Sequence, residues 1–486
     1  MNVAVLGCGN IGYECAVLFS NVEKIWILDI RKPDYMNMFL DEHANAQFVY
    51  MNAVSEDSIK AALVEIDSID VLIVTVGTTT KATSVENYKD FKRVFEINYY
   101  GVVNPITQIL SKGKLSKNAK VLIITSTSGH HAHKSLDPYA PSKWALENFS
   151  SALSSELSME GKQVYIIRPS TIQNERSSDF KSENGIAASV VAEKIYNLVT
   201  SEKSSGWSYY LPSTKRVLHI AERVFPSLLD TAYRLKPYWQ RKKLYAKFDK
   251  KTALITGASS GLGMELAYAL VNEYERLYIV ARSSDKLEAL RGELKSVCDV
   301  QVITADVGTT EGMNKVVQVI EGERLDLLVN NAGIQMKKDV SELSLENSKR
   351  SMEVNYFAPV YLTSKLIATG NKPKRVVNIL STTAIAGRRT LSIYSATKAA
   401  LWCFSRSLRR VYGDEMEVVE VLPATFESGL SCDGKGSHGL TSKDVAKKII
   451  FGLHEHKERI VIPKLKGHLF MIGEAVAPES FRKKFR

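Results

Sequence analysis

The chain has 486 residues, of which 45% are hydrophobic and 24% charged, a composition typical of a water-soluble globular protein with room for two domains. No apolar run reaches the ~18 residues that a membrane-spanning helix needs, and a glycine-rich turn follows the first apolar run so closely that a signal peptide has no place. These features exclude a helical integral membrane protein and predict a cytoplasmic one.

The formal net charge of +11 and the pI near 9.1 favour an acidic partner, such as a phosphorylated substrate or an anionic membrane surface, or else reflect an uneven surface. No nucleic-acid-binding module is recognisable, so nucleic acid is not an expected partner. The basic residues concentrate between 236 and 251 and at the end of the chain.

Cysteine and histidine usage gives no sign of a metal site. The five cysteines are odd in number and share no metal-ligand spacing, so we expect reduced thiols. A short tract holds His130, His131 and His133, but no carboxylate or cysteine partner stands at a useful spacing. A substrate-lining loop or a solvated turn is the preferred interpretation.

The first strand is predicted at 3–6 and leads through a Gly-x-Gly-x-x-Gly motif into a helix that ends near Phe19. Glycines between a strand and a helix let the backbone approach a pyrophosphate, which then lies at the positive helix N-terminus. The candidate cofactor contacts of this motif are Gly7, Gly9, Asn10, Ile11 and Gly12.

The second strand, 25–28, ends in Asp29. A carboxylate at this place accepts the ribose 2′-hydroxyl and repels a 2′-phosphate, so the first domain is predicted to bind NAD. Further strands then alternate with helices, which predicts a doubly wound parallel α/β sheet. The strands are expected at 48–50, 71–74, 121–124 and 164–167, and the helices at 55–65, 85–110 and 139–158.

The alternation stops between 213 and 250, where apolar residues at helical spacing are interleaved with basic and aromatic ones. Two interpretations stay open: a helix lying on a membrane surface, which would place the protein at the inner face of the membrane, or a helix packed on protein between two domains. A similar basic, amphipathic tail follows at 464–486. The predicted organisation is domain one, 1–212; linker, 213–250; domain two, 251–463; and tail, 464–486.

Domain two begins again with a strand and a second glycine motif, in which Gly257, Gly261 and Gly263 are the glycines. After its next strand, 277–280, the chain continues with Ala281, Arg282 and Ser283 and has no acid there. A guanidinium binds a 2′-phosphate through charge-assisted hydrogen bonds, so domain two is predicted to bind NADP.

Four polar residues recur in the same order in both halves. A Tyr-x-x-x-Lys places the tyrosine and the lysine one helical turn apart, where the ammonium can lower the pKa of the phenol. A serine lies thirteen residues before each tyrosine, and an asparagine lies farther upstream. The two sets are Asn98, Ser126, Tyr139 and Lys143 in domain one, and Asn355, Ser381, Tyr394 and Lys398 in domain two.

This repeated set resembles the catalytic tetrad of the short-chain dehydrogenase/reductase family, and the chain resembles two such domains in tandem. The resemblance implies two Rossmann-like domains, each followed here by an amphipathic extension, and pairing of the domains within one chain or between copies. It implies that Tyr exchanges a proton with the substrate oxygen, Ser binds that oxygen, Lys also holds the ribose, and Asn positions a relay water. Additional cofactor contacts implied are Gly77 in domain one and Ser259, Ser260, Leu262, Asp306, Asn331, Ala332 and Gly333 in domain two.

The resemblance predicts an NAD(P)-dependent oxidoreductase that interconverts a secondary alcohol and a ketone. NAD in domain one and NADP in domain two suggest oxidation followed by reduction, a net epimerisation of a hydroxyl centre, on a lipid-linked or sugar-type substrate. Domain one departs from the family in its glycine motif and in having Val74-Thr-Val-Gly77 where the family has Asn-Asn-Ala-Gly. The alternative is therefore one NADPH-dependent ketoreductase, domain two, beside a non-catalytic domain one that binds cofactor or regulates.

Overall fold

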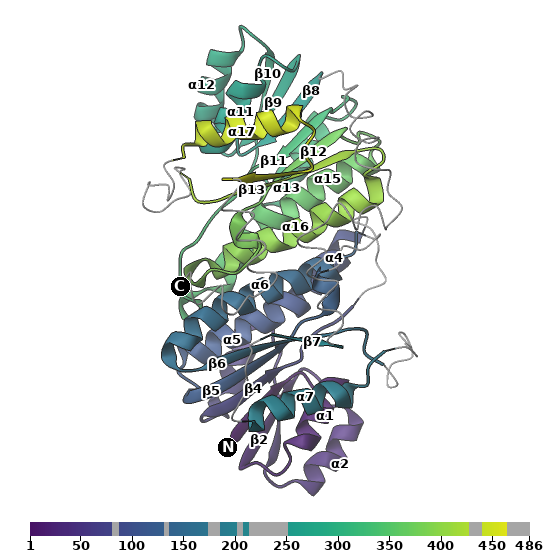
Figure 1. Cartoon of the computed structure of the whole chain (residues 1–486), viewed down its shortest axis with the longest axis vertical. Coiled ribbons are helices and arrows are strands. Elements are labelled where there is room, and N and C mark those ends of the chain that lie inside the picture. Colours follow the sequence, from purple (N-terminus) through teal and green to yellow (C-terminus); the bar gives the residue numbers. More distant parts are fainter. Residues whose placement is uncertain are drawn as a thin grey trace.

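The computed structural model describes residues 1–79, 87–130, 136–173, 185–201, 208–212, 251–426 and 440–463. Within them the chain forms two α/β halves, one after the other, as predicted (Figure 1). The linker 213–250, the tail 464–486, His131 and His133 lie outside the described residues, and with them the predicted membrane contact. None of the described helices is long and apolar enough to cross a membrane.

The first half is built on a parallel seven-stranded sheet in the order β3-β2-β1-β4-β5-β6-β7. Both faces of this sheet are covered, which is why its strands read as continuous apolar runs. The strands are β1 Asn2–Leu6, β2 Lys24–Asp29, β3 Ala46–Tyr50, β4 Ile69–Val74, β5 Leu115–Ile124, β6 Gln163–Pro169 and β7 Ser208–Leu211.

Seven α-helices are described in this half, and the strand-helix alternation predicted from the sequence is confirmed. The stretch expected to be one helix over 85–110 contains a π-helical turn, η2 Glu96–Tyr100, between two α-helices. The helices are α1 Asn10–Leu18, α2 Asp34–Glu42, α3 Glu56–Val64, α4 Tyr88–Phe95, α5 Gly101–Ser111, α6 Tyr139–Leu157 and α7 Ala188–Thr200.

The second half repeats the same sheet, with the order β10-β9-β8-β11-β12-β13-β14. Its strands are β8 Thr252–Thr256, β9 Arg276–Ala281, β10 Asp299–Thr304, β11 Leu327–Asn330, β12 Arg375–Ile379, β13 Glu417–Pro423 and β14 Arg459–Ile462. Its helices are α11 Gly261–Leu270, α12 Ser284–Leu294, α13 Thr310–Val319, α14 Leu345–Met352, α15 Ala358–Ala368, α16 Ser392–Tyr412 and α17 Ser442–His454, with a π-helical turn η6 Glu353–Phe357.

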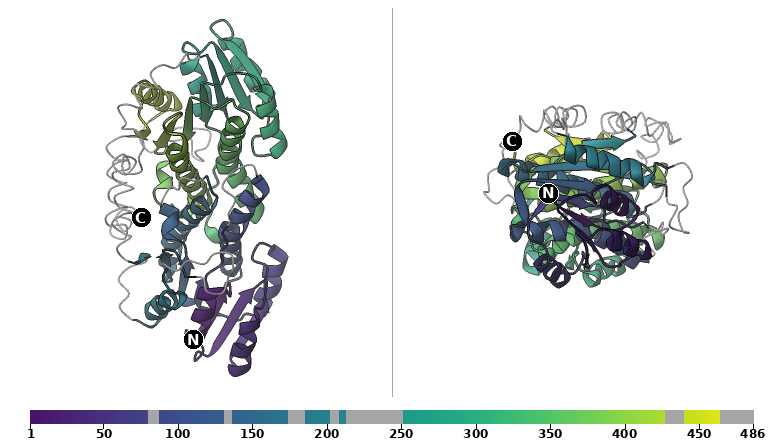
Figure 2. Two further views of the ribbon diagram at one scale, coloured as in Figure 1. Left: turned by 90° about the vertical axis from the view of Figure 1, so that its right-hand side faces the viewer. Right: turned by 90° about the horizontal axis from the view of Figure 1, so that it is seen from below.

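The two halves meet through their long helices, α6 and α16, which pack against each other in the middle of the molecule (Figures 1 and 2). Trp144 of α6 lies 5.1 Å from Trp402 of α16, measured between ring centroids. One apolar cluster runs without interruption from the inner face of one sheet to the inner face of the other. The domains therefore share a core, which association of separate domains through polar surfaces would not give.

Buried polar contacts also cross this interface. Asn148 of α6 donates from Nδ2 to the Ala384 carbonyl at 3.0 Å. Glu156, at the end of α6, accepts from the Val340 N–H at 2.9 and 3.0 Å. Burial raises the pKa of Glu156, and that N–H counteracts the shift. These bonds satisfy polar groups that would otherwise be buried without partners.

Gly387 gives a test of how closely the halves approach. A Cβ at Gly387 would lie 2.0 Å from the Asn148 carbonyl oxygen and 2.9 Å from the Ala152 nitrogen, both on the α6 backbone, which cannot move aside cheaply. We expect Gly387→Ala to destabilise the chain by about 1–3 kcal/mol, measured as a fall in the thermal unfolding midpoint. Gly292→Ala in α12, where a Cβ meets nothing within 4 Å, is the control; equal midpoints for the two variants would contradict the close packing.

Candidate active sites

The two glycine motifs form similar turns at the carboxyl ends of β1 and β8. Gly7 has φ +98° and Gly257 has φ +69°, backbone conformations that favour glycine. A Cβ at Gly12 would lie 1.9 Å from the Gly7 carbonyl oxygen, and one at Gly263 would lie 2.2 Å from the Gly257 carbonyl oxygen. Each last glycine thus lets its helix pack tightly on the turn, although the turn of domain one is one residue shorter.

The other predicted contacts lie in the same turns. Asn10 and Ile11 open α1, whereas Gly261 and Leu262 open α11. Space around Gly9 is open, since a Cβ there would meet nothing within 4 Å. Ser259 and Ser260 lie in the loop between β8 and α11. An open backbone turn at a helix N-terminus fits the pyrophosphate of a dinucleotide.

The departure in domain one from the Asn-Asn-Ala-Gly sequence is compensated at one of its two asparagines. In domain two Asn331 donates from Nδ2 to the Thr256 carbonyl at 2.9 Å and to the Gly257 carbonyl at 3.2 Å. In domain one the Thr75 hydroxyl makes the matching bonds, to the Leu6 carbonyl at 3.3 Å and the Gly7 carbonyl at 2.8 Å. A hydroxyl therefore does for the shorter turn what the amide does for the longer one.

The other asparagine of that sequence has no polar counterpart. Asn330 donates to Asn378 Oδ1 at 2.8 Å, and Asn378 donates in turn to Ser405 Oγ at 2.8 Å, which links β11, β12 and α16. Domain one has Val74 and Ile123 at the corresponding places in its sheet, both buried. An apolar pair there leaves no polar group without a partner, so domain one keeps a consistent sheet.

The residues predicted to select the cofactor end the second strand of each sheet. The Asp29 carboxylate accepts from the Cys8 N–H at 2.7 Å and from the Arg31 N–H at 3.2 Å, and it has further lone pairs for a ribose hydroxyl. Strand register pairs Thr256 with Val280, so Ala281 takes the place of Asp29, and Arg282 follows it, exposed. Asp29 thus contacts the glycine turn of domain one, and Arg282 lies one residue beyond the equivalent place in domain two.

Asp306 lies after β10, where its carboxylate accepts from Arg350 Nη2 at 2.8 and 2.5 Å and from the Gly308 N–H at 2.9 Å. This ion pair ties the loop after β10 to α14.

The predicted tetrad of domain two comes together at the ends of β11 and β12 and the start of α16. Ser381 forms a hydrogen bond with Tyr394. Lys398 Nζ donates to the Ile379 carbonyl at 2.8 Å and lies 5.7 Å from the centroid of the Tyr394 ring. A Cβ at Gly333, just after Ala332, would lie 3.6 Å from that Nζ, so the lysine is next to the predicted cofactor loop.

Domain one places its four residues in the same way. Ser126 forms a hydrogen bond with Tyr139, and Lys143 Nζ lies 5.9 Å from the Tyr139 ring centroid. A Cβ at Gly77 would lie 3.1 Å from Lys143 Nζ and 3.6 Å from Asn98 Oδ1. The predicted residues of both tetrads therefore converge.

Each asparagine sits in the π-helical turn of its domain and is held by a matched pair of bonds. Asn355 Oδ1 accepts from the Ile334 N–H at 2.8 Å, and its Nδ2 donates to Thr397 Oγ1 at 3.0 Å. Asn98 Oδ1 accepts from the Thr78 N–H at 2.6 Å, and its Nδ2 donates to Ser142 Oγ at 3.0 Å. π-helical turns of this kind are frequent at functional sites.

Burial dominates the electrostatics of both sites. It raises the pKa of Tyr394 to about 12 even though the hydrogen bond from Ser381 lowers it, and it lowers the pKa of Lys398 to about 8. Burial also raises the pKa of Tyr139 and lowers the pKa of Lys143 to about 8. The pKa of each tyrosine is therefore raised, and not lowered as the Tyr-x-x-x-Lys spacing had predicted, because desolvation of the buried phenol outweighs the hydrogen bond from its serine.

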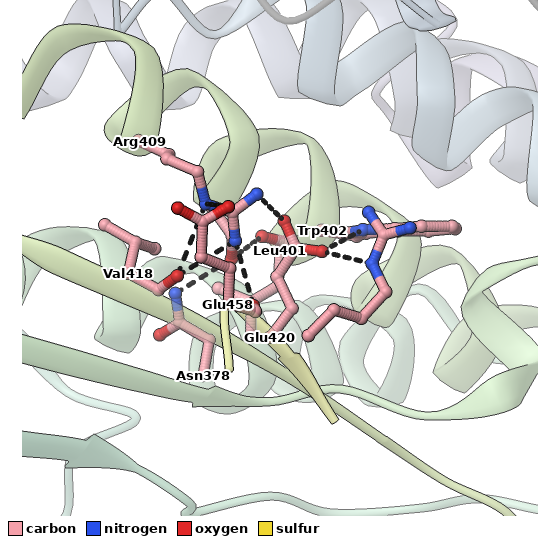
Figure 3. A network of polar contacts seen from close by, with 9 residues as sticks. Asn378, Leu401, Trp402, Arg409, Val418, Glu420 and Glu458 are labelled. Atoms are coloured by element: carbon pink, nitrogen blue, oxygen red, sulfur yellow. Dashed lines mark hydrogen bonds and ion pairs between the residues drawn. The ribbon is translucent and has the colours of Figure 1, made fainter. Parts of the chain in front are cut away.

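A buried charge network fixes α16, the helix that carries Tyr394 and Lys398, on the sheet (Figure 3). Glu420 of β13 accepts from Arg409 at 2.9 Å, from Trp402 Nε1 at 2.9 Å and from Arg459 of β14 at 2.9 Å. Burial would raise the pKa of Glu420, but the surrounding guanidiniums outweigh it and hold that pKa below its usual value. The helix is thereby fixed in rotation and height above β13.

In domain one a buried ion pair also fixes α6, the helix that carries Tyr139, on the sheet. Arg168 on β6 donates to both oxygens of Glu147 on α6, at 2.8 and 2.7 Å. Here the strand supplies the cation and the helix the anion, the reverse of domain two. Among the described residues, no group of His, Cys, Asp and Glu is arranged to hold a metal ion.

Comparison with known proteins agrees with this geometry. The sequence pattern of the short chain dehydrogenase family matches residues 2–185 and again 251–433. The chain belongs to the short-chain dehydrogenase/reductase family. It is an NAD(P)-dependent oxidoreductase with two family domains in tandem.

Two curated relatives each correspond in length to about half of this chain. The uncharacterized oxidoreductase DltE of Bacillus subtilis is 32% identical over 233 residues, 46% of this chain and 91% of the relative. The NADP-dependent 3-hydroxy acid dehydrogenase of Schizosaccharomyces pombe is 30% identical over 239 residues, 45% of this chain and 92% of the relative.

One solved structure spans both halves. An N-terminal ketoreductase from a macrolactin assembly line covers 91% of this chain, with 87% of its own length aligned, at a TM-score of 0.58 and 12% identity. At that identity the likeness concerns the fold alone.

Several positioning residues were not predicted from the sequence: Thr75, Ser142, Thr397 and the buried charge pairs. An alignment of the two halves would have revealed part of this set, because Ser142 and Thr397 occupy the same place in the two Tyr-x-x-x-Lys stretches, directly before Lys143 and Lys398. The charge pairs could not be found by such an alignment, since the cation is on the strand in domain one and on the helix in domain two.

Because Lys398 is buried, we expect its replacement by an apolar side chain to raise the stability of the chain, by an amount that depends on pH. Below pH 8 the ammonium of Lys398 is charged in both the folded and the unfolded chain, so folding bears the full desolvation cost. Between the folded pKa of about 8 and the unfolded value of 10.5 the folded chain releases the proton, and the cost fades. Lys398→Met should therefore be more stable than the parent at pH 7, by on the order of 3 kcal/mol, with the gain declining as the pH approaches 10.

Thermal unfolding midpoints across this pH range check the expectation. Lys295→Met, at the exposed end of α12, supplies the baseline. A gain for Lys398→Met that does not change with pH, or a loss at pH 7, would contradict the buried-charge account.

Proposed function

We propose that both domains are catalytic: domain one oxidises a secondary alcohol with NAD, and domain two reduces the resulting ketone with NADPH. The observation that carries this proposal is the matched set of hydrogen bonds around Asn98 and Asn355, with Ser, Tyr and Lys in equivalent places. A domain kept only as a scaffold would not need the complete set.

The cofactor assignment rests on the second strand of each sheet. Asp29 presents a carboxylate that suits a ribose diol and repels a 2′-phosphate, whereas the exposed Arg282 suits a 2′-phosphate. The open glycine turns and the lysines beside Gly77 and Gly333 support nicotinamide dinucleotide binding in both domains.

In the proposed mechanism the bound nicotinamide accepts or supplies the hydride, and the protein handles the proton. Ser381 holds the substrate oxygen and Tyr394 donates its phenolic proton to that oxygen during reduction, which the raised tyrosine pKa favours because the phenol stays protonated. Lys398, kept beside the tyrosine by the Ile379 carbonyl, stabilises the phenolate that is left. Asn355 positions the water that returns the proton.

Domain one uses Ser126, Tyr139, Lys143 and Asn98 in the opposite direction. Tyr139 first releases its phenolic proton to water, a step that its raised pKa shifts to higher pH, and the phenolate then takes the hydroxyl proton. With NAD⁺ held in domain one and NADPH in domain two, the cofactors would supply the hydride exchange, while Tyr139 would accept the proton of the alcohol and Tyr394 would donate a proton to the ketone oxygen. If the second hydride is delivered to the opposite face, the product is the epimeric alcohol. A lipid-linked or sugar-type substrate remains the hypothesis, with the extensions at 213–250 and 464–486 as its membrane contacts.

The second candidate is a single NADPH-dependent ketoreductase in domain two with a non-catalytic domain one. The shorter glycine turn and the apolar Val74 favour it. The S. pombe relative, named as an NADP-dependent 3-hydroxy acid dehydrogenase, suggests 3-hydroxy and 3-oxo acids as the first compounds to test.

Tyrosine variants separate the two candidates. Removing the phenolic hydroxyl abolishes proton transfer, so we expect Tyr139→Phe to lower NAD-dependent oxidation by at least about 100-fold and to spare NADPH-dependent reduction. Tyr394→Phe should do the reverse. The assay follows nicotinamide absorbance with a panel of secondary alcohols and ketones that includes ethyl acetoacetate and its hydroxy ester. An unchanged oxidation rate in Tyr139→Phe would mean that domain one is not catalytic.

Cofactor choice is tested at Arg282. We expect Arg282→Ala to weaken NADPH binding about 10- to 100-fold, the loss of one or two charge-assisted hydrogen bonds, and to leave NADH binding in domain one unchanged. Fluorescence titration of the reduced cofactors measures both. Equal NADPH affinity in parent and variant would contradict the assignment of NADP to domain two.

A further inference from the structure

Two ion pairs cross between the halves at the π-helical turns. Lys92 of α4, in domain one, donates from Nζ to both carboxylate oxygens of Glu353, at 2.7 and 2.8 Å. Lys349 of α14, in domain two, lies 3.5 Å from Glu96. The two pairs are equivalent positions of the internal repeat with the domains exchanged, the reciprocity expected of an isologous interface.

Each glutamate opens the turn that carries the asparagine of its own domain. Glu353 begins η6, and its backbone carbonyl accepts from the Ala358 N–H, which closes the wide π-helical turn around Asn355. Glu96 begins η2, and its carbonyl accepts from the Gly101 N–H around Asn98. The residue whose carbonyl closes each turn is thus held through its side chain by a lysine of the other domain.

Further contacts fix Lys92 against domain two. Its Nζ lies 5.2 Å from the centroid of the Phe357 ring, at the end of η6, and 4.9 Å from that of Tyr88 on its own helix. The side chains of Lys92 and Glu353 are 29% and 25% exposed, whereas those of Lys349 and Glu96 are 40% and 48% exposed. Shorter distances and lower exposure strengthen an ion pair, so the contact from domain one to domain two is the stronger.

We infer that each domain supplies a positioning residue to the active site of the other: Lys92 positions Asn355 through Glu353, and Lys349 positions Asn98 through Glu96. This inference rests on the proposed function for its effect on rate, but the positioning itself is a property of the interface. It explains why the two domains occupy one chain, since a separated domain would lose the lysine that fixes its relay asparagine. The two contributions are unequal, because the Lys92–Glu353 pair that serves domain two is stronger than the Lys349–Glu96 pair that serves domain one.

Hydrogen–deuterium exchange on the full chain measures how firmly each π-helical turn is held, and it needs no substrate. In Lys92→Met we expect the peptide covering 353–358 to exchange several-fold faster while the peptide covering 96–101 is unchanged. Lys349→Met should give the opposite pattern with a smaller effect. Lys92→Arg should restore slow exchange, and Lys89→Met, exposed on the same helix α4, is the matched control.

The rate readout uses Tyr139→Phe as background, so that domain two alone reduces ethyl acetoacetate. There we expect Lys92→Met to lower kcat about tenfold, the scale of a displaced positioning group, with the Kd for NADPH unchanged within about twofold. Lys92→Arg should recover most of the rate. Lys89→Met, the exposed control on α4, should leave this rate at the level of the background variant.

The crossed pattern is decisive. Exchange that speeds equally in both turns, or in neither, would overturn the inference, as would a lower unfolding midpoint in Lys92→Met without a local change at 353–358. A parent chain that reduces no ketone of the panel while the crossed exchange pattern holds would refute the proposed function and support the positioning role.

Discussion

The packing of α6 against α16 is the constraint on which the rest of the molecule depends. The same helices carry Tyr139 with Lys143 and Tyr394 with Lys398, so the surface that joins the halves lies directly behind the two candidate active sites. One apolar cluster fills the space between the sheets. A change that loosens this cluster therefore reaches both tyrosines, and neither half can be regarded as an independent module.

Burying charged side chains in this shared core costs desolvation free energy, and two groups of side chains respond to it differently. The charges that only hold structure, Arg168 with Glu147 and Glu420 with Arg409 and Arg459, are paired within the described part of the chain. The lysines of the two sites are instead left with shifted pKa values near 8. Unrelieved desolvation is a feature of sites that bind or react, because the ligand supplies the missing interactions.

The sequence was sufficient to predict the sheets, the glycine turns and the close approach of Asn, Ser, Tyr and Lys in each half, because each depends on local patterns that the chain repeats. It was insufficient for the electrostatics of the tyrosines, since burial depends on how the halves pack, which spacing along a helix does not reveal. Thr75 shows the same limit: a threonine in place of an asparagine looked like a lost feature, yet its hydroxyl reaches the same carbonyls. Reversed partners such as Arg168 and Glu420 appear only when strands and helices are placed in space.

We propose that one chain holds two working cofactor sites of opposite preference. Isothermal titration of the full chain with NAD⁺ and NADP⁺, separately and then one after the other, tests it most directly. We expect one site per chain for each cofactor, and saturation by NADP⁺ should leave the binding of NAD⁺ intact. A single site for which the two compete, or no binding of NAD⁺ at all, would contradict it and leave domain two as the only dehydrogenase.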